Sequence, residues 1–335
     1  MKIDAEVAVG EPMEAADLAR KAEEYGFDAF WVNETKHDPF VQLALASTAT
    51  SRIGLGTSIA LAFTRSPMTM AYTSWDLQSA SGGRLMLGLG SQVKGHIERR
   101  FGLSWDPPAP KMREYVSALR CVWKSWQEGT KLEFRGKFYS LDLMTPFFTP
   151  NPIRHPAIPV LVAGVNDMMC RVAGSVADGL HVHPLHTVRY LREVVAPALA
   201  AGAAKAGRDK GEVQVAASVF AAVGETEQEV AAVKEAYRGQ IAFYASTRSY
   251  RRVMALHHWE DVADRLHALS MSGEWRRMAS EVGDEMLREF VVEGTWQDIG
   301  KKIKSKYDGL LDRARVYLPF DGDPSWKAMV QGFKA

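Results

Sequence analysis

The chain of 335 residues is 47% hydrophobic, which is enough to bury one large α/β core or two smaller ones. Its 41 basic and 40 acidic side chains give a formal net charge of +1, which argues against a dedicated nucleic-acid surface. The N-terminus does not resemble a signal peptide and no uncharged run is long enough to span a bilayer, so we expect a cytoplasmic protein that contacts neither nucleic acid nor membrane.

Strand-like and helix-like segments alternate along the whole chain. The first pair is typical: residues 3–9 predict a strand, and the amphipathic residues 12–27, with an early proline and a late glycine, predict a helix. Seven further strands are predicted at 29–34, 53–61, 84–90, 157–164, 179–184, 213–223 and 314–320. Helices are predicted between them, at 39–51, 67–79, from 96, at 111–127, 166–178 and 187–207, and within 226–307.

Alternation of this kind implies parallel strands joined by right-handed crossovers. Eight strand–helix units over residues 1–335 fit a single (β/α)8 TIM-barrel domain better than two doubly wound domains. Two insertions interrupt the repeat. Residues 132–144 predict a small hairpin before the fifth strand, and residues 238–295 predict a helical insertion before the eighth.

The chemistry of such a barrel lies in the loops that follow its strands. The glycine-rich segment RLMLGLGSQVKGH (84–96) nearly matches two phosphate-binding fingerprints. Val93 replaces the third glycine of GxGxxG, and His96 replaces the lysine of the P-loop pattern. We interpret Gly88 and Gly90 as the end of the fourth strand, where a backbone without side chains lets a flat ligand approach closely.

Five segments carry a resemblance to a known family. They occur in order over nearly the whole chain: RIGLGTSIALAFTRSP, LQSASGGRLMLGLGSQ, GRLMLGLG followed by HIERRFG, LVAGVNDMMCRVAGSVADG, and GTWQDIGKKIKSKYDG. The chain resembles the bacterial luciferase-like flavin and deazaflavin oxidoreductases, and most closely the branch that uses the deazaflavin coenzyme F420. The resemblance implies an F420-dependent oxidoreductase, a homodimer like many of its family, that transfers a hydride to or from a small organic substrate at the barrel mouth.

Two alternatives remain open beside this reading. The same barrel could be an FMN-dependent monooxygenase, or a non-catalytic protein that binds a flavin or deazaflavin. F420 has a long anionic tail, so its site needs basic residues at the rim, and Arg65, Lys94 and Arg99 are candidates.

The resemblance also assigns a coenzyme site. It implies a non-prolyl cis peptide between Ser58 and Ile59, forming a bulge that presses on the back of the isoalloxazine ring. It implies a loop beside the coenzyme at 90–92, and a phosphate-binding turn at 163–165 before a helix whose free N–H groups face an anion. The residues assigned to the coenzyme are Ser58, Ile59, Gly90, Ser91, Gln92, Ala163, Gly164 and Val165.

The chain departs from the pattern of the related F420-dependent sugar-phosphate dehydrogenases at three places. Their Asp-His-Phe after the second strand, which includes a histidine base, is Glu-Thr-Lys at 34–36 here. Val93 replaces an acidic residue of theirs, and His186 replaces a lysine that helps them to bind substrate phosphate. We therefore expect a different substrate.

Five residues near the mouth are candidates for proton transfer: Glu34, His37, His181, His183 and His186. We retain His37, Glu34 and His183 as candidate proton donors, with water as the alternative source. We favour His37, because histidine titrates near neutral pH and the adjacent Asp38 would raise its pKa if the two side chains meet. The HVHP segment at 181–184 has the spacing of a two-histidine metal site, but no third ligand accompanies it at a suitable spacing. We therefore predict no metal.

Overall fold

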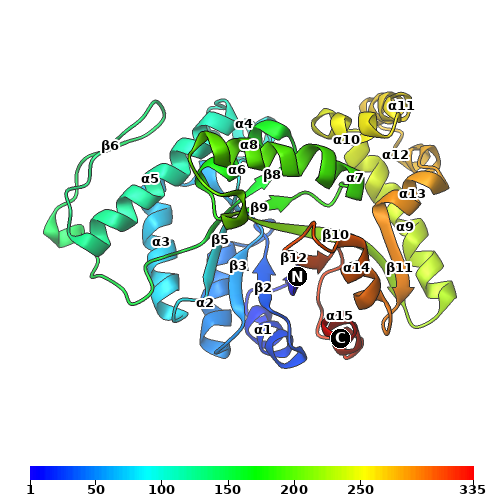
Figure 1. Ribbon diagram of the computed structural model, residues 1–335, viewed down its shortest axis with the longest axis horizontal. Helices are drawn as coiled ribbons and strands as arrows, with labels where there is room; N and C mark the ends of the chain where they lie inside the picture. Colours follow the sequence, from blue (N-terminus) through cyan, green and yellow to red (C-terminus); the bar gives the residue numbers. More distant parts are fainter.

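Eight parallel strands form a closed barrel in the computed structural model, which describes residues 1–335 (Figure 1). Each strand pairs in parallel with two neighbours, and the ring closes because β10 pairs with both β9 and β12. In ring order the strands are β1 (Lys2–Val7), β2 (Ala29–Val32), β3 (Gly54–Thr57), β5 (Leu85–Gly90), β8 (Val160–Gly164), β9 (Gly179–Val182), β10 (Gln214–Gly224) and β12 (Arg313–Val316). The predicted (β/α)8 TIM barrel is confirmed.

Helices surround the barrel and cover its outer face (Figure 1). The first of them buries Ala15, Ala19 and Ala22, which its period places on one face, and it ends at Gly26, whose φ of 89° suits a residue without a Cβ. Eighty-seven buried hydrophobic residues pack as one cluster. The helices between strands are α1 (Glu14–Tyr25), α2 (Pro39–Ala49), α3 (Pro67–Ala80), α4 (Lys94–Arg99), α5 (Pro108–Glu128), α6 (Asp167–Val176), α7 (Val188–Tyr190), α8 (Ala196–Lys205), α9 (Glu227–Ala245) and α14 (Ile299–Tyr307), and α15 (Ser325–Lys334) follows the last strand. None of the helices is long and apolar enough to cross a membrane.

Both predicted insertions are present. The hairpin consists of β6 (Phe134–Arg135) and β7 (Ser140–Leu141), which pair antiparallel and extend away from the barrel (Figure 1). The second insertion follows α9, which begins well before residue 238. It contains the helices α10 (Arg251–Leu256), α11 (Glu260–Met271), α12 (Trp275–Met278) and α13 (Asp284–Phe290).

The prediction that this insertion is helical up to residue 295 is wrong at its end. Its last five residues form a strand, β11 (Val291–Thr295), which pairs with Phe220–Gly224 in the outer half of β10. The inner half of β10 closes the barrel, so β11 extends the sheet outside the ring. Five residues are too few for periodicity to distinguish a strand from the end of a helix.

A buried polar layer lies inside the barrel, below the mouth. Asp4 on β1 and Arg313 on β12 form two hydrogen bonds of 2.7 Å, and Trp31 Nε1 donates to Asp4 at 2.8 Å. Burial raises the pKa of Asp4, although Arg313 opposes this shift. The bidentate pairing satisfies both charged groups, so the barrel interior is packed and closed beneath the site.

Candidate active site

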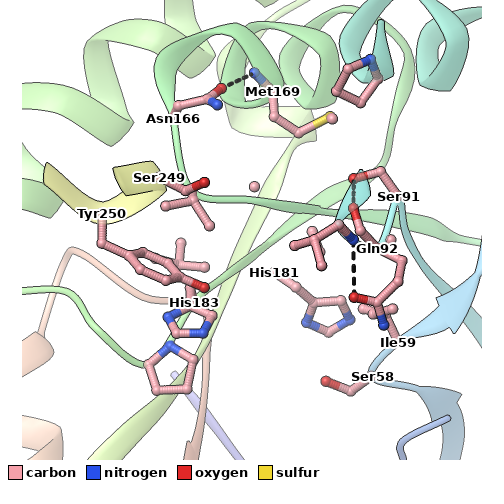
Figure 2. A pocket seen from close by; sticks show the side chains of 18 of the residues that line it. Ser58, Ile59, Ser91, Gln92, Asn166, Met169, His181, His183, Ser249 and Tyr250 are labelled. Carbon is pink, nitrogen blue, oxygen red and sulfur yellow. Dashed lines mark hydrogen bonds between the residues drawn. The ribbon is translucent and has the colours of Figure 1, made fainter. Parts of the chain in front are cut away.

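A cavity of about 590 Å³ opens at the carboxyl ends of the barrel strands. Figure 2 shows Ser58 and His181 towards one end of it and Asn166 and Met169 towards the other, with Tyr250 on a side wall. The eight residues that were assigned to a coenzyme all line it: Ser58, Ile59, Gly90, Ser91, Gln92, Ala163, Gly164 and Val165. The barrel therefore brings together three segments of the chain, the first and last of which are more than 100 residues apart in sequence, as a single binding site requires.

One wall of the cavity is the bulge after β3. The peptide bond between Ser58 and Ile59 is cis, as predicted. Ser58 is anchored on both sides, because its N–H donates to the Val32 carbonyl at 2.7 Å and its hydroxyl accepts from Arg315 at 2.6 Å. The Ile59 side chain packs directly over Gly90, where a Cβ atom would lie only 2.5 Å from Ile59 Cδ1. A side chain at residue 90 would therefore displace the Ile59 side chain from this position.

The loop after β5 forms a second wall. Gln92 has a φ of 57°, in the left-handed region that few non-glycine residues adopt and that recurs at functional sites. Its side-chain oxygen accepts the N–H of Val93 at 3.0 Å, and Ser91 donates to the Gln92 carbonyl at 3.1 Å (Figure 2). Local hydrogen bonds thus hold the loop in the shape that faces the cavity.

The turn after β8 leads into α6 at the far end of the cavity. Asn166 caps this helix by accepting the N–H of Met169 at 3.0 Å, while the N–H groups of Val165 and Asn166 donate to no acceptor in the chain. Asp167 in the first turn pairs with Arg252 at 2.6 Å, which offsets its negative charge. Free N–H groups at a positive helix end suit an anion such as a phosphate.

The floor of the cavity is a network around Arg315 of β12. Its guanidinium donates to Glu6 at 2.6 Å, to Ser218 at 2.7 Å and to Ser58 at 2.6 Å. It also lies 3.3 Å from Nδ1 of His181. Because a guanidinium only donates, this contact leaves the proton of a neutral His181 on Nε2. Burial and the two nearby arginines hold the pKa of His181 well below its usual value, so the ring is neutral.

Sequence reasoning missed Glu6 and Arg315. The signal was nevertheless present, since the first strand carries acids at positions 4 and 6 and the last carries arginines at 313 and 315. Residues two apart on a strand point to one side, and β1 and β12 are neighbours in a closed barrel with Asp4 opposite Arg315. Charges of opposite sign at matching positions of two buried strands indicate a polar layer inside the barrel.

His183 lies on the wall formed by the insertion. Its ring packs edge-on against Tyr244, with centroids 4.5 Å apart, and beneath Tyr250 at 4.4 Å (Figure 2). Burial, with His186 nearby, lowers its pKa to about 3, so it is neutral at pH 7. Its Nδ1 accepts the N–H of Leu185 at 3.1 Å, which places the ring proton on Nε2.

The other two predicted proton donors do not line the cavity. Nε2 of His37 lies 2.9 Å from the Gly10 carbonyl oxygen. Asp38, which was expected to act on His37, instead caps α2 and pairs with Arg65 at 2.7 Å. Glu34 is also paired with Arg65, at 2.8 Å. Only His183 among the three candidates reaches the cavity.

The predicted basic rim is also only partly in place. Lys94 lines the cavity and is largely exposed, with Glu98 at 3.8 Å. Arg65 is occupied by two carboxylates, and Arg99 does not line the cavity. Of the three predicted basic residues, Lys94 alone lines the cavity.

A second, smaller cavity of about 200 Å³ adjoins the first and shares Glu6 with it. Its walls come from the ends of β1, β2 and β12 and are mostly aliphatic. The remaining lining residues are Val7, Asn33, Val316, Tyr317, Leu318 and Pro319.

The fold and the site together define a (β/α)8 barrel with a deep ligand cavity at its carboxyl-terminal mouth. The chain belongs to the luciferase-like monooxygenase family, whose profile matches residues 2–313. The family membership expected from the five sequence segments is confirmed.

Relatives of this chain include both uncharacterised proteins and reductases. An uncharacterised protein of Mycobacterium tuberculosis is 46% identical over 320 residues, covering 96% of this chain and 94% of that protein. A 5,10-methylenetetrahydromethanopterin reductase of Methanolobus tindarius is 28% identical over 300 residues, covering 88% and 87%. The coenzyme F420 dependent tetrahydromethanopterin reductase of Methanopyrus kandleri has a similar structure, with a TM-score of 0.77, 23% identity, and coverage of 98% and 97%. An F420-dependent secondary alcohol dehydrogenase, solved with an F420-acetone adduct, has a TM-score of 0.74 and 20% identity, with coverage of 100% and 99%.

Proposed function

We propose that this protein is an F420-dependent oxidoreductase that transfers a hydride between F420 and a small organic substrate. The observation that carries the proposal is the convergence of all eight residues assigned to the coenzyme on one cavity. The names of the reductase and dehydrogenase of similar structure add support, because both refer to F420.

The residues of the cavity fit a coenzyme of this kind. Ile59 offers apolar surface to a flat ring, and the free N–H groups of Val165 and Asn166 at the other end of the cavity suit a phosphate. Lys94 gives a positive charge at the rim for further anionic groups. Bound F420 supplies the hydride donor or acceptor, and the protein supplies orientation and electrostatics.

His183 acts on the substrate as a neutral hydrogen-bond donor. Its Nδ1 is occupied by the N–H of Leu185, so Nε2–H is free to bind a carbonyl or hydroxyl oxygen of the substrate. Reduction of a carbonyl would need a hydride and a proton; the fixed N–H donor would stabilise the negative charge that develops on the oxygen, and water would supply the proton. Tyr250 lies over the imidazole and holds its plane.

The smaller cavity, which His183 does not line, provides room for an apolar part of a substrate whose reacting group lies in the main cavity. Its aliphatic walls, the Asn33 amide and the Glu6 carboxylate fit a small apolar molecule that carries a hydrogen-bond donor. Glu6 borders both cavities, so a molecule bound there lies next to the coenzyme.

The family resemblance also implies a homodimer. This oligomeric state stays a prediction, which analytical ultracentrifugation would check.

The experiment is a titration with F420 and with FMN at matched ionic strength, followed by fluorescence quenching. We expect F420 to bind more tightly than FMN. Replacement of Gly164 by aspartate should weaken F420 binding by about tenfold or more, because the carboxylate opposes the coenzyme phosphate at the α6 N-terminus. Gly164→Asn is the matched control, because asparagine has the size of aspartate without its charge, and a Cβ atom in either variant would meet the Leu180 side chain at 2.8 Å.

Two results would overturn the proposal. Tight binding of FMN without F420 would favour the FMN-dependent monooxygenase, and tight F420 binding without redox turnover on any substrate of a broad panel would favour a non-catalytic binding protein. Equal affinity of the aspartate and asparagine variants, both folded, would show that the phosphate binds elsewhere.

A further inference from the structure

Glu34 holds the segment that carries Ile59. The backbone N–H of Glu34 donates to the Ile59 carbonyl at 3.3 Å, and its carboxylate accepts the N–H of Leu61 at 2.7 Å. These two hydrogen bonds lie on either side of Ala60 along the chain. Ala60 itself pairs with Leu89 of β5. Glu34 therefore fixes the backbone immediately after Ile59, although its own side chain does not line the cavity.

The carboxylate of Glu34 is itself held in place. Arg65 donates to both of its oxygens, at 2.9 and 2.8 Å, and donates to Asp38 at 2.7 Å. The Glu34 and Arg65 side chains are only 11% and 18% exposed, so solvent screens this pair less than a surface pair. Turning Glu34 towards the cavity would leave both Arg65 and the Leu61 N–H without their partner.

Ile59 is the side chain that this arrangement controls. It lies between Gly90 and the open cavity, so it has no room to retreat from a ligand. A shift of the backbone at residues 59–61 moves its side chain into or out of the cavity. Misplacement of a contact by as little as 1 Å is enough to change binding or rate substantially.

We propose that Glu34 is a positioning residue that sets where Ile59 meets the flat ring of the coenzyme. Its action passes through the backbone bonds to Ile59 and Leu61 and not through contact with the coenzyme. This inference rests on the proposed function, because it requires a ring-bearing ligand against Ile59. It also assigns Glu34 a different role from the proton donor that the sequence indicated.

The test compares Glu34→Ala and Glu34→Gln with Asp38→Asn, using F420 as the probe. Glu34→Ala should raise the Kd for F420 by about tenfold, or about 1.4 kcal/mol, and shift the visible absorption band of the bound coenzyme. Glu34→Gln keeps an oxygen that accepts from Leu61 and should lie between this variant and the wild type. Asp38→Asn also loses a contact with Arg65 but retains the α2 cap, and it should bind within about twofold of the wild type.

A double-mutant cycle identifies the path of the effect. If Glu34 acts through Ile59, adding either Glu34 substitution to Ile59→Ala should change the Kd by less than about twofold. Additive losses, or folded Glu34 variants that match Asp38→Asn, would overturn this inference alone. A wild type that binds neither F420 nor FMN would overturn the proposed function and this inference with it. If circular dichroism shows that Glu34→Ala is unfolded, the cycle with Glu34→Gln gives the decision.

Discussion

Two glycines on β5 differ in what a methyl group would meet, and this difference predicts separate effects on folding and on binding. A Cβ at Gly88 would lie 1.9 Å from the backbone oxygen of Thr57. A Cβ at Gly90 would meet only the Ile59 side chain, at 2.5 Å from Cδ1 and 2.7 Å from Cγ1. Displacing a backbone oxygen in a closed barrel costs much free energy, whereas the end of an isoleucine side chain can move at a smaller cost.

The displacement in Gly90→Ala can be worked out from these distances. Non-bonded carbons rest about 3.5–4.0 Å apart, so the Ile59 methyl must move by roughly 1 Å or more. Its open side is the cavity, where a coenzyme ring would lie. The displaced Ile59 would then destabilise the complex with F420 by about 1–3 kcal/mol, the usual cost of overpacking, and this would raise the Kd for F420 by roughly fivefold to 150-fold.

The assay pairs F420 titration with thermal unfolding for three alanine variants. Gly90→Ala should melt close to the wild type and bind F420 weakly, whereas Gly88→Ala should melt several degrees lower or fail to fold. Gly239→Ala on α9 is the control for binding, because nothing lies within 4 Å of its Cβ position, and it should melt slightly above the wild type because alanine favours a helix interior over glycine. A folded Gly90→Ala variant with wild-type affinity would refute the placement of the coenzyme against Ile59.

Two further predictions concern the buried histidines. His183→Leu removes the Nε2–H donor, so it should leave the Kd for F420 within about twofold and lower kcat by about 100-fold on a substrate found by panel screening, with His37→Leu as the control that retains activity. Equal activity of the two variants would contradict the role of His183. Burial lowers the pKa of His183 to about 3 and that of His186 to about 4. In the unfolded chain each histidine has a pKa of about 6.5, so below pH 6.5 the unfolded state binds more protons than the folded state. The free energy of unfolding is therefore highest above pH 6.5 and falls as the pH drops towards 4. Between pH 7 and pH 5 the free energy of unfolding should fall by on the order of 1–2 kcal/mol per histidine. Measured by denaturant unfolding, it should change less with pH in His186→Asn than in the wild type. The same pH dependence in both proteins would count against a neutral His186.

The barrel could be predicted from the sequence because its signal repeats. Each strand is a short apolar run followed by an amphipathic helix, and this pattern occurs often enough to outweigh errors of a few residues at the ends. The strand β11 is not part of this repeating pattern, so the sequence did not predict it. Its residues VVEGT follow directly on a helix and pair with the outer half of β10, a partner that only the three-dimensional course of that strand reveals.

The residues assigned to a coenzyme all line one cavity, whereas two of the three retained proton-donor candidates do not, and this difference has a physical reason. The positions of Gly90 and Gly164 depend on the course of the backbone, which follows from the element order. A role for His37 or Glu34 depends on where a side chain points, and this depends on partners distant in sequence. Arg65, which is 31 residues after Glu34, draws that carboxylate away from the cavity.

Arg315 connects the strands that form the floor of the cavity. Its donors reach Glu6 on β1, Ser58 after β3, His181 on β9 and Ser218 on β10, so one side chain joins four parts of the ring beneath the cavity. Only a guanidinium has enough fixed donors for this, and removing one partner of a buried ion pair costs about 3–5 kcal/mol. The floor therefore tolerates little change without loss of the barrel. Selection among substrates must then depend on the walls and the loops, where a substitution alters a contact with the ligand and leaves the closed ring intact.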